Sequence, residues 1–208
     1  MSKLSLPIRY VMKVYLCGII VFLLFRIVLF FSNFNMFLNL PNERINLLFR
    51  SFLMEFRFDT VIANYILFFP FILLSFSSVF KGIQKATYRF FNYYISLLFI
   101  GSFFLCAADI PYFTHFFSRL TTASMAWTDN LGFMFSMVFQ EFKYCGMIIP
   151  LILICFLFVR QLIKIRKTAL LELEQDRGIS FKGFTFHFIT FLLFGGLMFL
   201  GIRGRIEE

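Results

Sequence analysis

Three charged residues, Glu55, Arg57 and Asp59, stand immediately before a long apolar run and are the residues best placed to do chemistry. In a helix over residues 44–60, Glu55 and Asp59 share one face because they are four positions apart, while Arg57 lies on the opposite face with Arg50. No residue three or four positions from either arginine is acidic. The pattern predicts either a polar cluster at the mouth of a helix bundle or an interfacial helix whose charges face solvent.

The sequence contains no catalytic motif and no metal-binding motif. It lacks GxSxG, Walker and HExxH patterns, and its 2 histidines and 4 cysteines show no ligand spacing. The cysteines lie in or at the ends of apolar segments and are interpreted as packing residues: Cys17, Cys106, Cys145 and Cys155. A Cys106–Cys145 disulfide is the alternative. No catalytic residue, metal site or cofactor is therefore predicted within this chain.

Composition indicates a membrane protein. Of 208 residues, 60% are hydrophobic and 36 are Phe, and the mean hydropathy is +0.84, which is not the composition of a soluble domain. Lys and Arg outnumber Asp and Glu by 20 to 11. In a soluble chain this excess would suggest nucleic-acid binding, but here the basic residues stand beside apolar runs. That placement indicates membrane topology, and no nucleic-acid partner is predicted.

The fold predicted from these runs is an all-α integral membrane protein with five transmembrane helices. Amphipathic helices on the membrane surface are expected after the first and third spans, over residues 44–60 and within 109–144. Pro70 should kink the second span, and Asp109 and Pro111 should end the third. Within a single transmembrane domain, residues 1–208, the predicted spans are 14–31, 61–80, 90–108, 145–160 and 184–202.

The basic residues are unequally divided between the two sides of this topology. One side, residues 1–13, 81–89 and 160–182, carries 12 Lys and Arg, against 7 on the other, excluding Arg26 inside the first span. The positive-inside rule then places the N-terminus in the cytoplasm and, after five crossings, the C-terminus outside. For Arg26 itself, snorkelling to the outer interface is favoured over an ion pair inside the bundle.

The outer face collects the candidate site residues. An anionic phospholipid head group would find arginines there whose apolar surroundings strengthen each contact. Asp59 or Asp109 is expected to pair with an arginine from another segment. The candidate polar cluster, or set of head-group contacts, is Arg57, Asp59, Asp109, Arg119, Arg203 and Arg205, with Tyr112 and Trp127 as interfacial anchors.

Four local strings resemble the membrane domain of the lipoteichoic acid synthase-like family: RFD at Arg57–Asp59, CAADIPYF at Cys106–Phe113, FFSRL at Phe116–Leu120 and GIRGRIEE at Gly201–Glu208. This family contains phosphoglycerol transferases and sulfatase-like proteins of the alkaline phosphatase superfamily. The resemblance implies five transmembrane helices before an extracellular α/β domain. In that domain a threonine nucleophile and a divalent metal, typically manganese, transfer a lipid head group. The sequence stops where that domain would begin, so no family catalytic or metal residue is carried onto this chain.

The resemblance implies a membrane-anchoring and lipid-presenting domain of such an enzyme, in a bacterial cytoplasmic membrane. Its expected partners are membrane lipids and its own C-terminal extracellular domain. The 208 residues alone are expected to show no phosphatase, sulfatase or transferase turnover. A stand-alone scaffold or interaction protein is the alternative. A small transporter is less favoured, because five spans without internal repeats give no two-fold arrangement.

Overall fold

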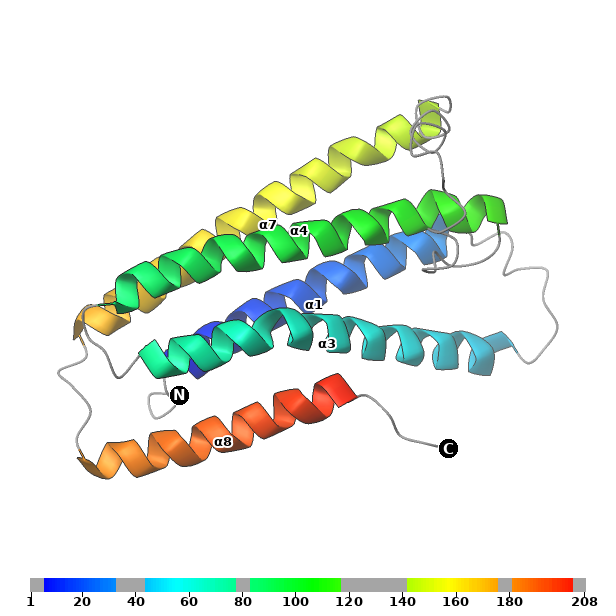
Figure 1. Cartoon of the computed structure of the whole chain (residues 1–208). Coiled ribbons are helices and arrows are strands. Elements are labelled where there is room, and N and C mark those ends of the chain that lie inside the picture. The colour runs from blue at the N-terminus through cyan, green and yellow to red at the C-terminus, as the bar shows by residue number, and fades with distance from the viewer. Residues whose placement is uncertain (1–5, 33–43, 78–82, 117–141, 176–180, 204–208) are drawn as a thin grey trace, which may run out of the picture.

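The computed structural model describes residues 6–32, 44–77, 83–116, 142–175 and 181–203. These residues form helices and no strand, which confirms the all-α fold. Each predicted span falls on one helix. The helices are α1 (Leu6–Ser32), α3 (Arg44–Ser77), α4 (Gln84–Phe116), α7 (Phe142–Gln175) and α8 (Phe181–Arg203) (Figure 1).

Four of the helices contain a stretch long and apolar enough to cross a membrane: Leu6–Ser32, Arg50–Ser77, Gln84–Ile110 and Ile148–Glu174. A helix of 27 residues, such as α1, spans about 40 Å and so exceeds a hydrocarbon core of about 30 Å. The apolar stretch recognised in α8 is shorter, Phe191–Gly201. Large apolar side chains are exposed along all five helices, as they are on lipid-facing surfaces. The chain is a multi-pass membrane protein.

The helices extend beyond the predicted spans. α3 is continuous from Arg44 through Pro70 to Ser77, so the predicted surface helix 44–60 and the second span form one helix. α4 likewise continues past Asp109 and Pro111 to Phe116. Ending a helix leaves four carbonyl groups without intrahelical partners, whereas a proline removes only one N–H donor. In a membrane the continued helix is therefore favoured. The second predicted surface helix falls mainly outside the described residues.

Successive helices run in opposite directions (Figure 1). α1, α4 and α8 begin at the end where α3 and α7 finish, which we call the N-terminal end of the bundle. The other end, where α1 and α4 finish and α3 and α7 begin, is the far end. α1 packs against α3, α4 and α7, and α8 packs against α3. α3 also packs against α4, and α4 against α7, so α1 and α3 together join the helices of the bundle.

Aromatic rings fill the space between α1, α4 and α7. The Phe103 ring contacts Phe22 at a centroid distance of 5.2 Å and Phe158 at 5.0 Å, both edge to face. α1 approaches closely because Gly18 has no side chain: a Cβ there would lie 2.8 Å from Cζ of Phe99, inside van der Waals contact. Since lipid is as apolar as these side chains, close packing rather than the hydrophobic effect holds such helices together.

α8 is attached to α3 through a second aromatic group. Phe71 of α3 stacks on Phe191 and contacts Phe194, each at a centroid distance of 5.2 Å. Near the end of α8, a Cβ on Gly201 would overlap the side-chain amide of Asn64. Asn64 lies five residues beyond Asp59 in the direction of the N-terminal end. α8 therefore contacts α3 on the N-terminal-end side of the charged residues identified from the sequence.

Candidate functional site

Arg26 of α1 is the centre of a buried polar group between α1 and α3. Its Nε donates to Oδ2 of Asp59 at 2.5 Å, and its Nη2 donates to Oδ1 at 2.6 Å. Only 9% of the Arg26 side chain and 4% of the Asp59 side chain are exposed. Two parallel, charge-assisted bonds between a guanidinium and a carboxylate are both strong and directional.

Glu55 completes this arrangement one helical turn away. Its backbone carbonyl accepts a second bond from Nη2 of Arg26 at 2.5 Å, and its carboxylate pairs with Nη1. Because Glu55 and Asp59 are four positions apart on α3, both reach the same guanidinium. We call Arg26, Glu55 and Asp59 the Arg26 cluster. The guanidinium offsets the repulsion between the two carboxylates, although with all three groups ionised the cluster still carries a net negative charge.

The prediction that Arg26 snorkels to the outer interface is wrong. Its guanidinium is turned onto α3 because two carboxylates lie within reach there. In a low-dielectric setting a paired bidentate contact is worth more than a partial approach to water. The alternative given by the sequence, an ion pair inside the bundle, is what the structure contains.

The pairing predicted for Asp59 is confirmed in kind: it binds an arginine from another segment. That arginine is Arg26 of the first span, which was not in the predicted set. Arg57, only two residues from Asp59, is exposed and lies on the opposite side of α3 with the exposed Arg50. Because residues two apart on a helix face different directions, Arg57 is not part of the buried cluster. Its role as a head-group contact stays a prediction.

The remaining predicted site residues are only partly described by the structure. Asp109 and Tyr112 are half-buried at the far end of α4. Arg203 is the last residue of α8, and its side chain lies outside the described part, as do Arg119, Arg205 and Trp127 entirely. α4 and α8 both pack against α3. The polar site that the described residues form around Asp59 is the Arg26 cluster.

A second polar group at the N-terminal end was not predicted from the sequence. Arg9 of α1 pairs with Glu172 of α7 at 3.0 Å, and Lys85 of α4 pairs with Glu174 at 2.7 Å. These pairs arise because α7 continues as a helix to Gln175, well beyond the predicted fourth span 145–160. Both pairs lie at least partly in solvent, where water and salt weaken their attraction, so each contributes little to stability. They connect the last turns of α7 to α1 and to α4.

The described residues show no fit to a metal. Within residues 6–32, 44–77, 83–116, 142–175 and 181–203, no group of three or more His, Cys, Asp or Glu side chains lies together. The manganese implied by the family resemblance thus has no ligand set in this part of the chain, and no chemistry is assigned to it. Cys17 and Cys155 carry free thiols. Cys145 of the alternative disulfide has a side chain outside the described part.

Comparison with protein-family models, with curated proteins and with solved structures finds no match for this chain. The resemblance to lipoteichoic acid synthase-like proteins accordingly stays a prediction. What can be assigned from the structure is a multi-pass membrane helix bundle with a buried, bidentate arginine–carboxylate cluster between its first two helices.

Proposed function

We propose that this chain is the membrane-anchoring and lipid-presenting domain of a lipoteichoic acid synthase-like phosphoglycerol transferase or sulfatase-like enzyme. In this proposal the N-terminal end of the bundle faces the cytoplasm of a bacterial cell and the far end faces outward. The catalytic α/β domain and its metal lie outside these 208 residues. The chain itself anchors that domain and holds the far end in a fixed shape beside the outer leaflet.

The observation that carries the proposal is the geometry of the string RFD at Arg57–Asp59. Asp59 is buried and clamped by Arg26, while Arg57 is exposed on the other side of the same helix. The clamp fixes the rotation of α3 about its own axis. An arginine held outward at a set orientation suits contact with an anionic lipid head group, since a guanidinium binds phosphate in a bidentate manner.

The distribution of charge supports the proposed orientation. Among the described residues, basic side chains gather toward the N-terminal end, with Glu172 and Glu174 as the acidic residues paired there. The positive-inside rule assigns such an end to the cytoplasm. The basic residues are Arg9, Lys13, Lys85, Arg89, Lys164, Arg166 and Lys167.

The test is transfer of labelled head groups in cells. The gene that encodes the chain is deleted, in its native reading frame, and cells are given phosphatidylglycerol labelled in its terminal glycerol phosphate. We expect the labelled glycerol phosphate to stop appearing in envelope products, and the wild-type gene to restore it. Arg57→Gln should lower transfer while leaving the protein in the membrane, whereas Arg50→Gln, the matched change on the same face of α3, should retain more of it.

Unchanged labelling after deletion would contradict the transferase proposal. It would favour the alternative, a stand-alone scaffold of the inner membrane. Equal effects of Arg57→Gln and Arg50→Gln, with transfer lost on deletion, would leave the transferase assignment standing but remove the specific role of Arg57. The two parts of the proposal are thus tested separately.

A further inference from the structure

The exposed side of α7 changes from apolar to basic along a single line of side chains. Positions 153, 156, 160, 164 and 167 follow one another at intervals of three or four residues and so share one side of the helix. All five are exposed, and they lie opposite Phe158 and Leu162, whose side chains are buried. We call this line the α7 outer face: Leu153, Phe156, Arg160, Lys164 and Lys167.

Aromatic contacts fix the level of the outer face relative to the other helices. Phe158 contacts Phe99 of α4 at a centroid distance of 5.2 Å, and Phe99 contacts Phe22 of α1 at 6.0 Å. Phe22 and Phe99 stand at the middle of the predicted spans 14–31 and 90–108. Phe158 therefore lies near the middle of the membrane. The part of the outer face that follows Phe158 in the sequence lies in the leaflet at the N-terminal end.

The basic residues of the outer face extend from the membrane surface into its apolar core. With the rise of an α-helix, Arg160, Lys164 and Lys167 lie about 3, about 9 and about 14 Å beyond Phe158 toward the N-terminal end. Half of a hydrocarbon core is about 15 Å thick. Lys167 is therefore at the surface of the core, whereas Lys164 and Arg160 are inside it. On α4, the residue at the level of Arg160 is the exposed, apolar Leu97.

No carboxylate among the described residues offsets these charges. Arg160, Lys164 and Lys167 form no ion pair with the described part of the chain. Glu174, two turns beyond Lys167 on the same side of α7, is bonded to Lys85 of α4. Reaching outward to water is also unfavourable, because helical side chains lean toward the N-terminus of their helix, which for α7 is at the far end. Basic groups at this depth therefore require an anion that comes to them.

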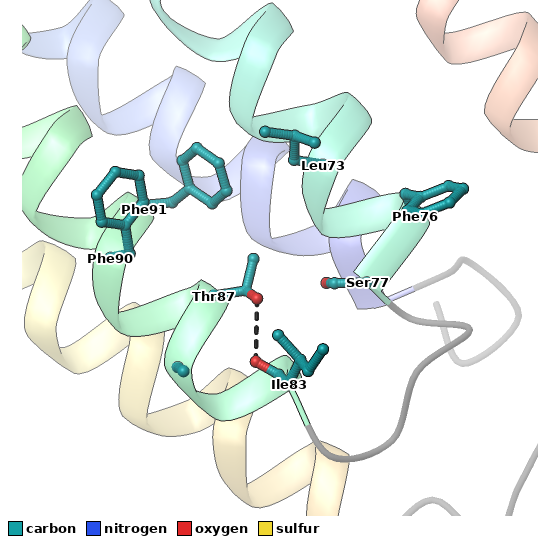
Figure 2. A pocket seen from close by; sticks show the side chains of 8 residues that line it. Leu73, Phe76, Ser77, Ile83, Thr87, Phe90 and Phe91 are labelled. Atoms are coloured by element: carbon teal, nitrogen blue, oxygen red, sulfur yellow. Dashed lines mark hydrogen bonds between the residues drawn. The ribbon is translucent and has the colours of Figure 1, made fainter.

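The groove between α3 and α4, at the same end of the bundle, lacks such a signal. Its lining residues are all uncharged, and Figure 2 shows Leu73, Phe76 and Phe90 on its walls. The hydroxyl of Thr87 is already used, since its Oγ1 donates to the carbonyl of Ile83 at 3.0 Å. The lining of this groove does not select one head group over another, whereas the charge of the α7 outer face does.

We propose that the α7 outer face binds one anionic phospholipid of the leaflet at the N-terminal end. Lys164 and Lys167 hold its phosphate and Arg160 extends toward it, through the charge-assisted bonds that ammonium and guanidinium groups make to phosphate. The phosphate lies deeper than in the surrounding leaflet, because two of its three partners lie inside the core. One acyl chain then passes the middle of the membrane and lies along Phe156 and Leu153, which are 61% and 56% exposed.

A lipid matches both parts of this face. Its phosphate complements the basic part, and its acyl chain complements the apolar part that continues the same line. A protein partner would instead have to remove a carboxylate from water at the depth of Lys164, which is costly. The lipid lies in the opposite leaflet from the head group proposed at Arg57, so the inference does not depend on the transferase assignment.

The experiment uses the full chain in phosphatidylcholine nanodiscs with two photoreactive probes. One is phosphatidylglycerol and the other phosphatidylcholine, each with a diazirine near the end of one acyl chain, and the cross-linked residues are mapped by mass spectrometry. Phosphatidylglycerol should label Leu153 and Phe156, because its phosphate is held inside the core and its chain end crosses the middle of the membrane. Phosphatidylcholine, whose head group stays at the surface, should label α7 mainly between Phe158 and Lys167.

Removing the basic residues tests the site directly. Lys164→Gln together with Lys167→Gln should reduce the preference for phosphatidylglycerol on the outer face about 25-fold, at about fivefold for each basic residue, and Arg160→Gln alone should reduce it about fivefold. Lys13→Gln together with Arg89→Gln is the matched control. It removes two exposed basic residues from the same end of α1 and α4 and changes the net charge equally, so the preference should persist.

Three outcomes would overturn the proposal. Equal labelling of the outer face by the two probes in the unaltered chain would mean ordinary annular lipid only. An equal loss of preference in the matched control would mean that the potential of the whole N-terminal end, and not the outer face, selects the lipid. Cross-links from the outer face to a second copy of the chain, with neither probe attached there, would mean that protein covers this face.

Discussion

At the scale of single residues, the Arg26 cluster illustrates how an ionised group is tolerated inside a membrane bundle. Removing a guanidinium and a carboxylate from water is costly, and the bidentate contact with Asp59 recovers that cost only with good geometry. The cluster is therefore weak evidence for high stability. Its clearer consequence is that it specifies how α3 packs against α1. Only one rotation of α3 about its axis, and one position along that axis, bring both Glu55 and Asp59 to Arg26.

Breaking this cluster should be far more damaging than removing the exposed arginines nearby. Asp59→Ala leaves a buried guanidinium with one carboxylate partner, and we expect the free energy of unfolding to fall by about 3–5 kcal/mol. Arg57→Ala and Arg50→Ala should each change it by less than about 0.5 kcal/mol, since both side chains are exposed. Denaturant titration of the purified protein in detergent micelles measures these differences. A loss at Arg57 as large as that at Asp59 would show that the cluster is wrongly defined.

Tyrosine hydroxyls on α1 and α4 offer a contrasting test. The Tyr88 hydroxyl is buried without a hydrogen-bond partner among the described residues, and its ring contacts Tyr10 edge to face at 5.2 Å. Because an unpartnered buried hydroxyl costs about 1–3 kcal/mol, Tyr88→Phe should leave the free energy of unfolding unchanged or raise it. Tyr15→Phe is the control: Tyr15 donates to Thr60 at 3.4 Å, so its loss should be slightly destabilising. Thermal unfolding in micelles would settle the sign, and destabilisation by Tyr88→Phe would indicate a hydrogen bond at that hydroxyl.

At the scale of helices, the apolar runs were sufficient to locate all five elements, because a membrane favours one regular structure for a long apolar segment. The ends were harder to predict. Asp109 and Pro111 indicate a helix stop in a soluble protein, yet α4 continues past both. The charged residues just before Thr60 were misleading in the same way. They suggested a separate surface helix, but α3 continues from its amphipathic half into its apolar half without a break.

The partner of Asp59 could not be derived from composition or periodicity, because 33 residues separate it from Arg26 and periodicity describes only one helix at a time. One signal was present nonetheless. Arg26 lies two turns from the end of its span, Asp59 lies just before the start of the next, and consecutive segments are usually neighbours. Opposite charges at matching depth on consecutive spans predict a pair.

Alanine substitutions at two glycines distinguish the effect of close helix packing on stability from the effect of helix propensity. Gly18 of α1 and Gly101 of α4 both lie within helices, but a Cβ on Gly18 would meet the Phe99 ring whereas a Cβ on Gly101 would meet nothing within 4 Å. Gly18→Ala should therefore destabilise by about 1–3 kcal/mol through overpacking. Gly101→Ala should be neutral or stabilising by up to about 1 kcal/mol, because alanine favours the helix. Parallel denaturation of the two variants makes the comparison, and equal shifts would argue against the close approach of α1 to α4.

At the scale of the whole molecule, the bundle has two chemically different ends. Basic side chains and two inter-helix ion pairs lie at the N-terminal end, and the buried Arg26 cluster lies toward the far end. α8 is joined to this arrangement mainly through α3, by the Phe71 stack and the Gly201 contact. A change in the position of α3 would thus move α8 with it, which links the Arg26 cluster to the C-terminal helix.

The alternation of helix directions makes the orientation of the whole molecule testable. Lys85 and Arg166 lie toward the N-terminal end, and Asn130 falls between α4 and α7, whose adjoining ends are at the far end (Figure 1). Because the excess of Lys and Arg should hold the N-terminal end in the cytoplasm, an alkaline phosphatase reporter, active only outside, should work near Asn130 or after Glu208 and fail near Lys85 or Arg166. A reporter active only in the cytoplasm should give the complementary pattern at the same positions, which controls for differences in expression. Activity of one reporter at all four positions would contradict five crossings, and the reversed pattern would keep the five crossings but invert the orientation.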